Sequence, residues 1–179
     1  MTSLRLNSVE RDAPSASCSF SDTIIEWERQ PPTGFVGPPH YWRTLHSERY
    51  LLKVGFEPET GALLGFTLVF YNGRVGRWSP QMGQMESKTG LPRFDVAPWA
   101  GPEARDHWGI MAITSRCECR LDVGESDVRI GLGESTPASS VKFAPSTAME
   151  FDADNLLVAI HVSNVTEGNI DRVLRSVGA

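Results

Sequence analysis

Cysteine is the residue type in this chain with the strongest intrinsic chemistry, and two of the three cysteines are near neighbours. Cys117 and Cys119 are separated by one residue, so a β-strand would place both thiols on one face. Two thiolates there could contribute to a metal site, but a tetrahedral zinc needs about four ligands, and no second pair occurs at the usual spacing. With Cys18 the count is odd, which does not suit a disulfide framework. The sequence therefore predicts free thiols in a reducing compartment, with no bound metal or cofactor.

The four histidines, which are the commonest general bases, are far apart in the sequence. His161 lies in a strongly apolar segment, where a hydrogen-bonded structural histidine is expected rather than a catalytic one. The chain has no phosphate-binding glycine loop, no nucleophile elbow and no metal-binding pair of histidines on a helix. A site assembled from distant residues is left open, because catalytic triads are recognised by geometry. No catalytic residue is predicted, and a non-enzymatic protein is expected.

The acidic residues are concentrated in the last third of the chain. Residues 117–179 contain 10 acidic and 5 basic residues, a difference of −5 that equals the net charge of the whole chain. This excess argues against direct binding of nucleic acid, which needs a basic surface, and suits a basic protein partner. The candidate partner-binding carboxylates are Asp122, Glu125, Asp127, Glu134, Asp152 and Asp154. The alternative is that they are ordinary solvated turn residues.

Residues 73–109 have an unusual composition, rich in glycine, proline and tryptophan. Long regular elements are not expected there, so the segment is predicted to be a long loop region. Because tryptophan is enriched at contact surfaces, Trp78 and Trp99 are candidate anchors for a partner. The alternative is that these aromatic side chains fold back over the sheet and join the core.

The elements that must position these residues are mainly strands. Residues 50–56 and 63–71 are apolar and flank the turn Glu57-Pro58-Glu59-Thr60-Gly61, which predicts a β-hairpin. Both faces of the second strand are largely apolar, so it should be central and covered on two sides. Residues 18–27 should form an earlier strand with Ile25 and Trp27 on one face, and residues 41–48 fit either a short helix or a lead-in to the hairpin.

The last third alternates as a meander of strands and ends in a helix. Strands are expected at 110–114, 117–123, 127–132, 141–143, 148–151 and 156–162. Thr166 is a good helix N-cap, and the apolar spacing predicts a helix over residues 167–177. The predicted fold class is α+β: a mainly antiparallel β-sheet, as a curved sheet or open sandwich, with the C-terminal helix packed on it.

Length predicts a single domain over residues 1–179, with residues 1–16 as a mobile arm. No apolar run is long enough to cross a membrane, and the first residues lack the pattern of a signal peptide. A cytoplasmic protein with no membrane contact is expected.

Residues 51–66 read LLKVGFEPETGALLGF. This segment resembles the strand, Pro-acid-Thr-Gly turn and strand of small bacterial proteins that include immunity proteins of polymorphic toxin and contact-dependent growth inhibition systems. The resemblance covers about one tenth of the chain. It implies a cytoplasmic protein that neutralises a cognate toxin, often a nuclease, by binding it. No functional residue is carried over, because such proteins share no binding motif.

Together these observations predict a non-enzymatic immunity protein. Its acidic residues from 117–154, with Trp78 or Trp99 as anchors, would cover the active site of a basic toxin and exclude the toxin's substrate. One alternative is a small-molecule-binding or enzymatic β domain with residues 73–109 as a lid over a pocket. Another is a structural adaptor or secretion-system subunit that assembles with itself.

Overall fold

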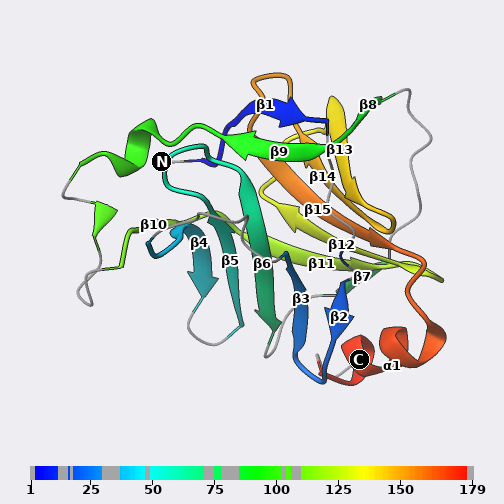
Figure 1. Ribbon diagram of the computed structural model, residues 1–179. Coiled ribbons are helices and arrows are strands. Elements are labelled where there is room, and N and C mark those ends of the chain that lie inside the picture. The colour runs from blue at the N-terminus through cyan, green and yellow to red at the C-terminus, as the bar shows by residue number, and fades with distance from the viewer. Residues whose placement is uncertain are drawn as a thin grey trace.

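The computed structural model describes residues 3–11, 16, 18–29, 37–46, 49–70, 75–77, 85–101, 104–105 and 110–176. Within these ranges the protein is mostly β, with two large sheets, one two-stranded ribbon and one α-helix (Figure 1). The prediction of an α+β fold dominated by antiparallel pairing is therefore confirmed. Figure 1 shows the strands of the two large sheets crossing each other at a steep angle.

The first large sheet has six strands in the order β10-β4-β5-β6-β3-β2. Its centre is the predicted hairpin of β5 and β6, and every pair is antiparallel except β10 with β4. Residues 41–48 fitted either a short helix or a lead-in to the hairpin, and in the structure most of them belong to strand β4. The strands are β2 (Ser19–Phe20), β3 (Ile24–Glu28), β4 (His40–His46), β5 (Tyr50–Phe56), β6 (Leu63–Phe70) and β10 (Ala112–Ser115).

The second large sheet has seven strands in the order β7-β11-β12-β15-β14-β13-β8. Its inner strands form the antiparallel meander that the alternating sequence predicts. The two edge strands, β7 and β8, instead pair in parallel with their neighbours. The strands are β7 (Val75–Arg77), β8 (Glu86–Thr89), β11 (Cys119–Val123), β12 (Asp127–Leu132), β13 (Ser139–Ala144), β14 (Thr147–Phe151) and β15 (Leu157–Ser163).

Two expectations about irregular segments were wrong. Part of the expected N-terminal arm is strand β1 (Leu6–Glu10), which pairs with β9 (Leu91–Phe94) in the ribbon above the sheets in Figure 1. The described parts of 73–109 contain β7, β8, β9 and a short 3-10 helix at Ala97–Trp99 instead of one long loop. Composition did not predict these strands, because each is short and is hydrogen-bonded to a strand that is distant in the sequence.

Side chains from both large sheets form one buried cluster. Trp27 from β3 meets the ring of Phe143 from β13 edge to face, with ring centroids 4.7 Å apart. Both Ile25 and Trp27 are buried, so the predicted inward face of this segment is confirmed. On β6 the outward residues Gly65, Thr67 and Val69 are only half-buried, so the expectation that this strand is covered on both sides was wrong.

The turn that carries the resemblance has a structural explanation. Gly61 adopts a φ of +69°, and a Cβ there would lie 2.0 Å from the carbonyl oxygen of Phe94, so glycine is required. The Glu57 carboxylate accepts a 2.6 Å hydrogen bond from the Thr60 hydroxyl and pairs with Arg29. These contacts fix the turn, which is why its residue types need not report a binding site.

The predicted C-terminal helix is present as α1 (Glu167–Ser176). Its buried residues Ile170 and Val173 belong to the common core, together with Val165 just before the helix. In Figure 1, α1 lies at the lower right, at the end of the molecule opposite the β1–β9 ribbon. In the described parts of the chain, no helix is both long and apolar enough to span a membrane.

Candidate binding surface on the six-stranded sheet

Asp122 does not belong to an exposed acidic face. Its side chain is 5 % exposed and lies 2.9 Å from Arg120 Nε and 3.7 Å from Arg129 Nη1. The expectation for this residue was wrong, because alternation along β11 turns it away from the core but not toward open solvent. Its charge is satisfied within the protein.

The other five carboxylates lie at opposite ends of the seven-stranded sheet. Glu125 and Asp127 are at the turn from β11 to β12, whereas Glu134 follows β12 and Asp152 and Asp154 lie between β14 and β15. Since β12 and β15 are antiparallel, the turn before β12 and the turn before β15 are at different ends. A single acidic surface over 117–154 is therefore not formed.

Two of these carboxylates also have local partners. Asp127 Oδ1 lies 3.1 Å from His161 Nε2, which gives this histidine a structural role. Asp152 Oδ1 accepts the backbone N–H groups of Asp154 and Leu156 and so shapes the tight turn. The interpretation of these two residues as turn and surface residues fits their contacts.

The predicted tryptophan anchors are not available either. Trp99 is 1 % exposed, packs edge to face on Phe56, and donates its indole N–H to the carbonyl oxygen of Tyr41 at 3.0 Å. It cannot reach a partner at the surface, so its assignment as an anchor was wrong and the alternative that it joins the core is confirmed. Trp78 lies outside the described residues.

The thiols are held in unreactive states. All three cysteines are free, and burial raises the pKa of the Cys18 and Cys119 thiols to about 12. Burial also raises the pKa of Cys117. Thiols with raised pKa values stay protonated near neutral pH and make poor nucleophiles and metal ligands. Within the described ranges no group of three or more His, Cys, Asp and Glu side chains is placed to hold a metal ion.

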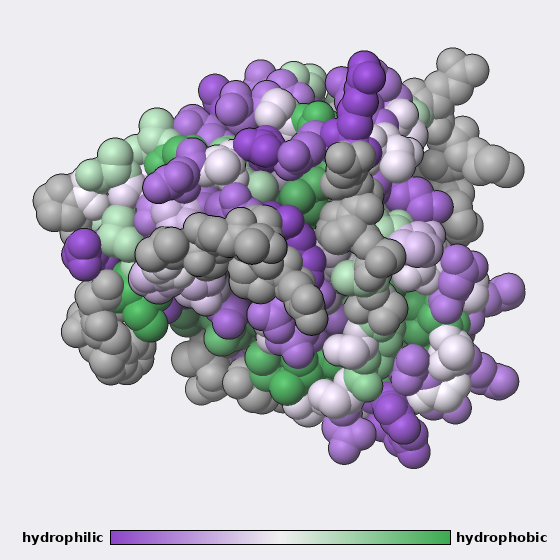
Figure 2. Space-filling view, viewed as in Figure 1, coloured by the Kyte–Doolittle hydropathy of each residue, from purple (hydrophilic) through white to green (hydrophobic). Residues whose placement is uncertain are grey.

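The outward face of the six-stranded sheet carries three cross-strand rows, and the first row is apolar. The pairing register aligns Ile24 with Val69, Val69 with Leu51, and Leu51 with Leu45. The first three are half-buried, and Leu45 is 47 % exposed. Figure 2 shows hydrophobic side chains reaching the surface near the lower ends of β5 and β6. Apolar residues aligned across four strands form a patch rather than isolated exposures.

The second row is charged and polar. It runs from Glu26 through Thr67 and Lys53 to Arg43, with Thr114 of β10 at its end. Thr67 donates a 3.1 Å hydrogen bond to Glu26, and Arg43 Nε donates a 2.8 Å hydrogen bond to the Thr114 hydroxyl. This row borders the apolar row on one side.

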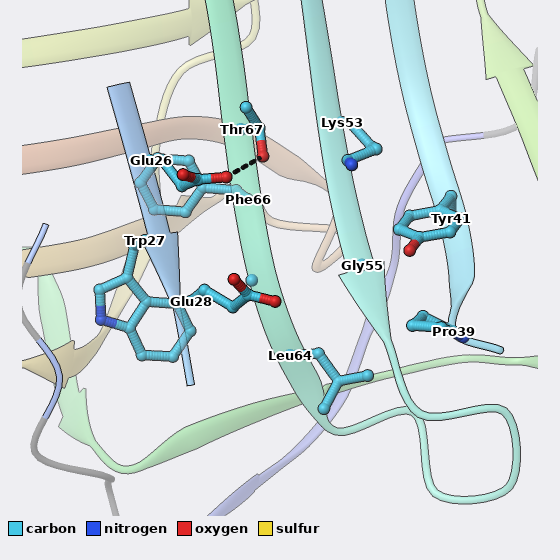
Figure 3. A pocket seen from close by; sticks show the side chains of 11 residues that line it. Glu26, Trp27, Glu28, Pro39, Tyr41, Lys53, Gly55, Leu64, Phe66 and Thr67 are labelled. Carbon is cyan, nitrogen blue, oxygen red and sulfur yellow. Dashed lines mark hydrogen bonds between the residues drawn. The ribbon is translucent and has the colours of Figure 1, made fainter. Parts of the chain in front are cut away.

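The third row contains a hollow, shown in Figure 3. It aligns Glu28, Gly65, Gly55 and Tyr41 across β3, β6, β5 and β4. Because the two central residues are glycines, the sheet surface drops to the backbone and leaves a hollow of about 80 Å³. In Figure 3 the Glu28 carboxylate and the Tyr41 hydroxyl face each other from opposite walls, and Lys53 stands at the rim.

Gly65 is required by its surroundings, whereas Gly55 is in close contact with a neighbouring ring. A Cβ on Gly65 would lie 2.7 Å from the carbonyl oxygen of Trp27, which is backbone and cannot yield. A Cβ on Gly55 would lie 3.1 Å from Cε1 of Tyr41, whose ring covers that glycine. The part of the hollow over Gly65 is therefore built into the strand pairing, and the Tyr41 ring bounds the other part.

The walls of the hollow are electrostatically coupled. Partial burial, with a smaller contribution from the Glu28 carboxylate, raises the pKa of Tyr41. The ammonium group of Lys53 lies 5.0 Å from the centroid of the Tyr41 ring, within the range of a cation–π interaction. Glu28 forms no ion pair with any residue that the structure describes.

A second, larger hollow of about 490 Å³ lies beside the link from β10 to β11. Its wall includes Leu45 at the end of β4, Arg49 and Tyr50 at the start of β5, residues 116–120 from the link and the start of β11, and the loop after β12. The Tyr50 hydroxyl and the Thr44 hydroxyl both donate to the carbonyl oxygen of Cys117 and tie these walls together. No described residue of 73–109 lines either hollow, so the described residues do not provide the predicted lid.

The sequence contained one usable signal for the outward face, which was missed. Lys53 and Gly55 on one strand, and Gly65 and Thr67 on the next, interrupt otherwise apolar strands at alternate positions. Such interruptions indicate a face that is not core, but only the register aligns them in rows.

No family model matches the chain, and no curated protein is significantly similar to it.

Proposed function

We propose that this protein is a non-enzymatic binding protein of the immunity type, which neutralises a cognate protein toxin in the cytoplasm. The outward face of the six-stranded sheet would cover the active site of the toxin, a nuclease being one candidate. The observation that carries the proposal is the apolar row of Ile24, Val69, Leu51 and Leu45 beside a charged row. Interfaces between proteins combine an apolar centre with charged and polar surroundings in this way.

The dimensions of this face favour a protein partner over a small ligand. Sites for small molecules usually enclose about 300–1,000 Å³ and bury most of the ligand. The hollow on this face has about 80 Å³, and the rest of the face is an open sheet. An open face of this kind suits contact with another protein surface.

Charge supports a basic partner. The face itself carries two carboxylates, Glu26 and Glu28, and two cations, Arg43 and Lys53, so it is close to neutral. The attraction comes from the chain as a whole, whose net charge of −5 would speed encounter with a basic toxin. The resemblance of residues 51–66 to immunity proteins agrees with such a partner.

Growth rescue tests the proposal. The C-terminal part of the protein encoded immediately upstream is expressed in a test bacterium, with and without this protein. We expect toxicity and rescue. Leu45→Glu should abolish rescue, because it places a charge on the most exposed residue of the apolar row. The matched control is Met85→Glu, a comparable change at a residue that is 38 % exposed beside β8 of the other sheet.

Two results would contradict the proposal. If the fragment is harmless, or if it stays toxic in the presence of this protein, the proposed immunity function is contradicted. If Leu45→Glu is folded and rescues as well as Met85→Glu, the six-stranded sheet is not the binding face. Circular dichroism melts of both variants show whether they are folded.

A second candidate function rests on the larger hollow. Its 490 Å³ falls within the usual range for small-molecule sites, and the Thr44 and Tyr50 hydroxyls hold Cys117, which lines it, by hydrogen bonds. A thermal shift screen with a metabolite panel tests this function. A clear shift by one compound would support a small-molecule-binding domain, whereas an immunity protein should leave the panel flat.

A further inference from the structure

We infer that the hollow over Gly55 and Gly65 is an anchor pocket for a single basic side chain of the partner, with the guanidinium group of arginine as its best occupant. This inference rests on the proposed function, since the side chain would come from the protein bound to the six-stranded sheet. It adds to that function the chemical group that the partner must present.

The size of the hollow selects a side-chain tip. The hollow has about 80 Å³, well below the roughly 300–1,000 Å³ of sites that enclose a drug-sized ligand. A nucleotide or another ligand of that size is too large to be enclosed, whereas a planar guanidinium or an ammonium group fits. Because Gly65 in the floor has no side chain, the tip of an incoming side chain can lie close to the sheet there.

The walls of the hollow select a cation. Glu28 supplies a carboxylate without an ion-pair partner in the described structure, and Glu26 stands in the neighbouring row. The Tyr41 ring forms the opposite wall (Figure 3). A carboxylate facing an aromatic ring can bind a guanidinium group by ion pairing on one side and by stacking on the other.

The contact between Lys53 and Tyr41 shows that this ring can interact with a cation. The Lys53 ammonium group already lies 5.0 Å from the Tyr41 centroid, so this ring attracts a cation within the protein itself. Lys53 also sets the expected direction of one substitution, because its positive charge repels a second cation in the same hollow. Removing this charge should strengthen the binding of a basic group, and removing the charge of Glu28 should weaken it.

The test measures the binding of model side chains by NMR. N-acetyl-arginine amide is titrated into ¹⁵N-labelled protein, and the amide signals of Gly55, Gly65 and Tyr41 are followed. N-acetyl-lysine amide, N-acetyl-norleucine amide and acetate are titrated separately. We expect the arginine compound to shift these signals most, the lysine compound less, and norleucine amide and acetate not at all.

Three variants determine the sign of the interaction. Glu28→Gln should weaken the binding of the arginine compound about threefold, the size expected for an exposed ion pair. Lys53→Met should strengthen it by a similar factor. The matched control Glu125→Gln removes the same charge at the turn between β11 and β12 and should change nothing. All three changes affect side chains at the surface, and thermal melts confirm that the variants are folded.

The anchor pocket is overturned if the arginine compound shifts no signal at these residues, or if acetate binds there more tightly. It is also overturned if Glu125→Gln weakens binding as much as Glu28→Gln, because net charge alone would then explain the effect. Failure of this inference is distinct from failure of the proposed function. If rescue depends on Leu45 but the arginine compound does not bind in the hollow, the sheet face remains the proposed binding surface and the anchor pocket is excluded.

Discussion

The two large sheets differ in how they treat the charged residues on their outward faces. On the seven-stranded sheet, Arg129 lies 2.9 Å from Glu150 and 3.7 Å from Asp122, and these side chains are only 12 %, 7 % and 5 % exposed. On the six-stranded sheet the charged and apolar rows are half-buried or exposed, and Glu28 has no ion pair with a described residue. One face closes its charges into buried ion pairs, whereas on the other the Glu28 carboxylate has no ion pair with a described residue.

This difference separates a structural role for charge from a binding role. Buried ion pairs require both partners, because a single buried charge is costly. Exposed charges contribute little to stability, so they are free to serve recognition. The same alternation of residues along a strand therefore has different consequences on the two sheets, and substitutions on the seven-stranded sheet should cost more stability than those on the six-stranded sheet.

Arg129→Met should have the largest effect. The substitution leaves the Asp122 and Glu150 carboxylates buried without their shared cation, which should lower the free energy of unfolding by about 3–5 kcal/mol. Urea denaturation followed by tryptophan fluorescence measures this loss. A loss below about 1 kcal/mol would mean that water satisfies these carboxylates and that the seven-stranded sheet is not closed in the way we describe.

Gly76→Ala should have the next largest effect, also on the seven-stranded sheet. A Cβ at this position of β7 would lie 2.2 Å from Oδ1 of Asp122, whose side chain is held by two arginines. We expect a loss of about 1–3 kcal/mol from overpacking, measured by urea denaturation. Pairing this substitution with Asp122→Ala should restore part of the packing, and an absence of coupling between the two would contradict the clash.

His40, at the start of β4, should make the six-stranded sheet sensitive to acid. Partial burial lowers the pKa of His40 below its usual value of 6.5, and its Nδ1 is buried without a hydrogen-bond partner in the described structure. The folded state thus binds this proton less readily than the unfolded state, so stability is fully present above pH 6.5 and falls as the pH drops below it.

Denaturation at pH 7.5 and pH 5.5 measures this effect, with His40→Phe as the comparison. The phenylalanine ring preserves the edge-to-face contact with Phe56 but cannot be protonated. The loss of stability on acidification should be smaller in the variant than in the parent. An equal loss in both proteins would assign the acid sensitivity to other groups.

Lys53→Met should have the smallest effect on stability. It removes a single half-buried cation–π contact, which contributes about 0.5–1 kcal/mol, and the methionine side chain retains much of the packing against Tyr41. Thermal denaturation should show a shift of at most a few degrees. A loss as large as that of Arg129→Met would erase the difference between the two outward faces.

Local patterns in the sequence predicted much of this fold. The hairpin around residues 57–61, the meander after residue 117 and the C-terminal helix all depend on nearby residues, and all three are present. The parallel pairs of β7, β8 and β10 could not be predicted in this way, because their partners are distant in sequence. Propensity carries no information about which edge a short strand will join.

The candidate surface was harder to predict than the fold. Counting charges identified acidic residues such as Asp122 and Asp127 but could not show that Asp122 is paired inside the protein and that Asp127 contacts His161. Composition also favoured Trp99 as an anchor, although its indole N–H is used within the core. The rows of the six-stranded sheet form only when strands that are distant in the sequence pair in register, and the sequence alone does not show this pairing.

The parallel edge strands have a consequence for the order in which the molecule opens. Strands β7, β8 and β10 come from the middle of the chain and lie at sheet edges. Each can pair only after its neighbouring strand has formed, so these three strands should form late in folding. In hydrogen exchange, their amides should lose protection through local opening, while those of β5, β6, β12 and β15 should exchange only on global unfolding. The middle of the chain would then behave as a detachable border around two more persistent sheets.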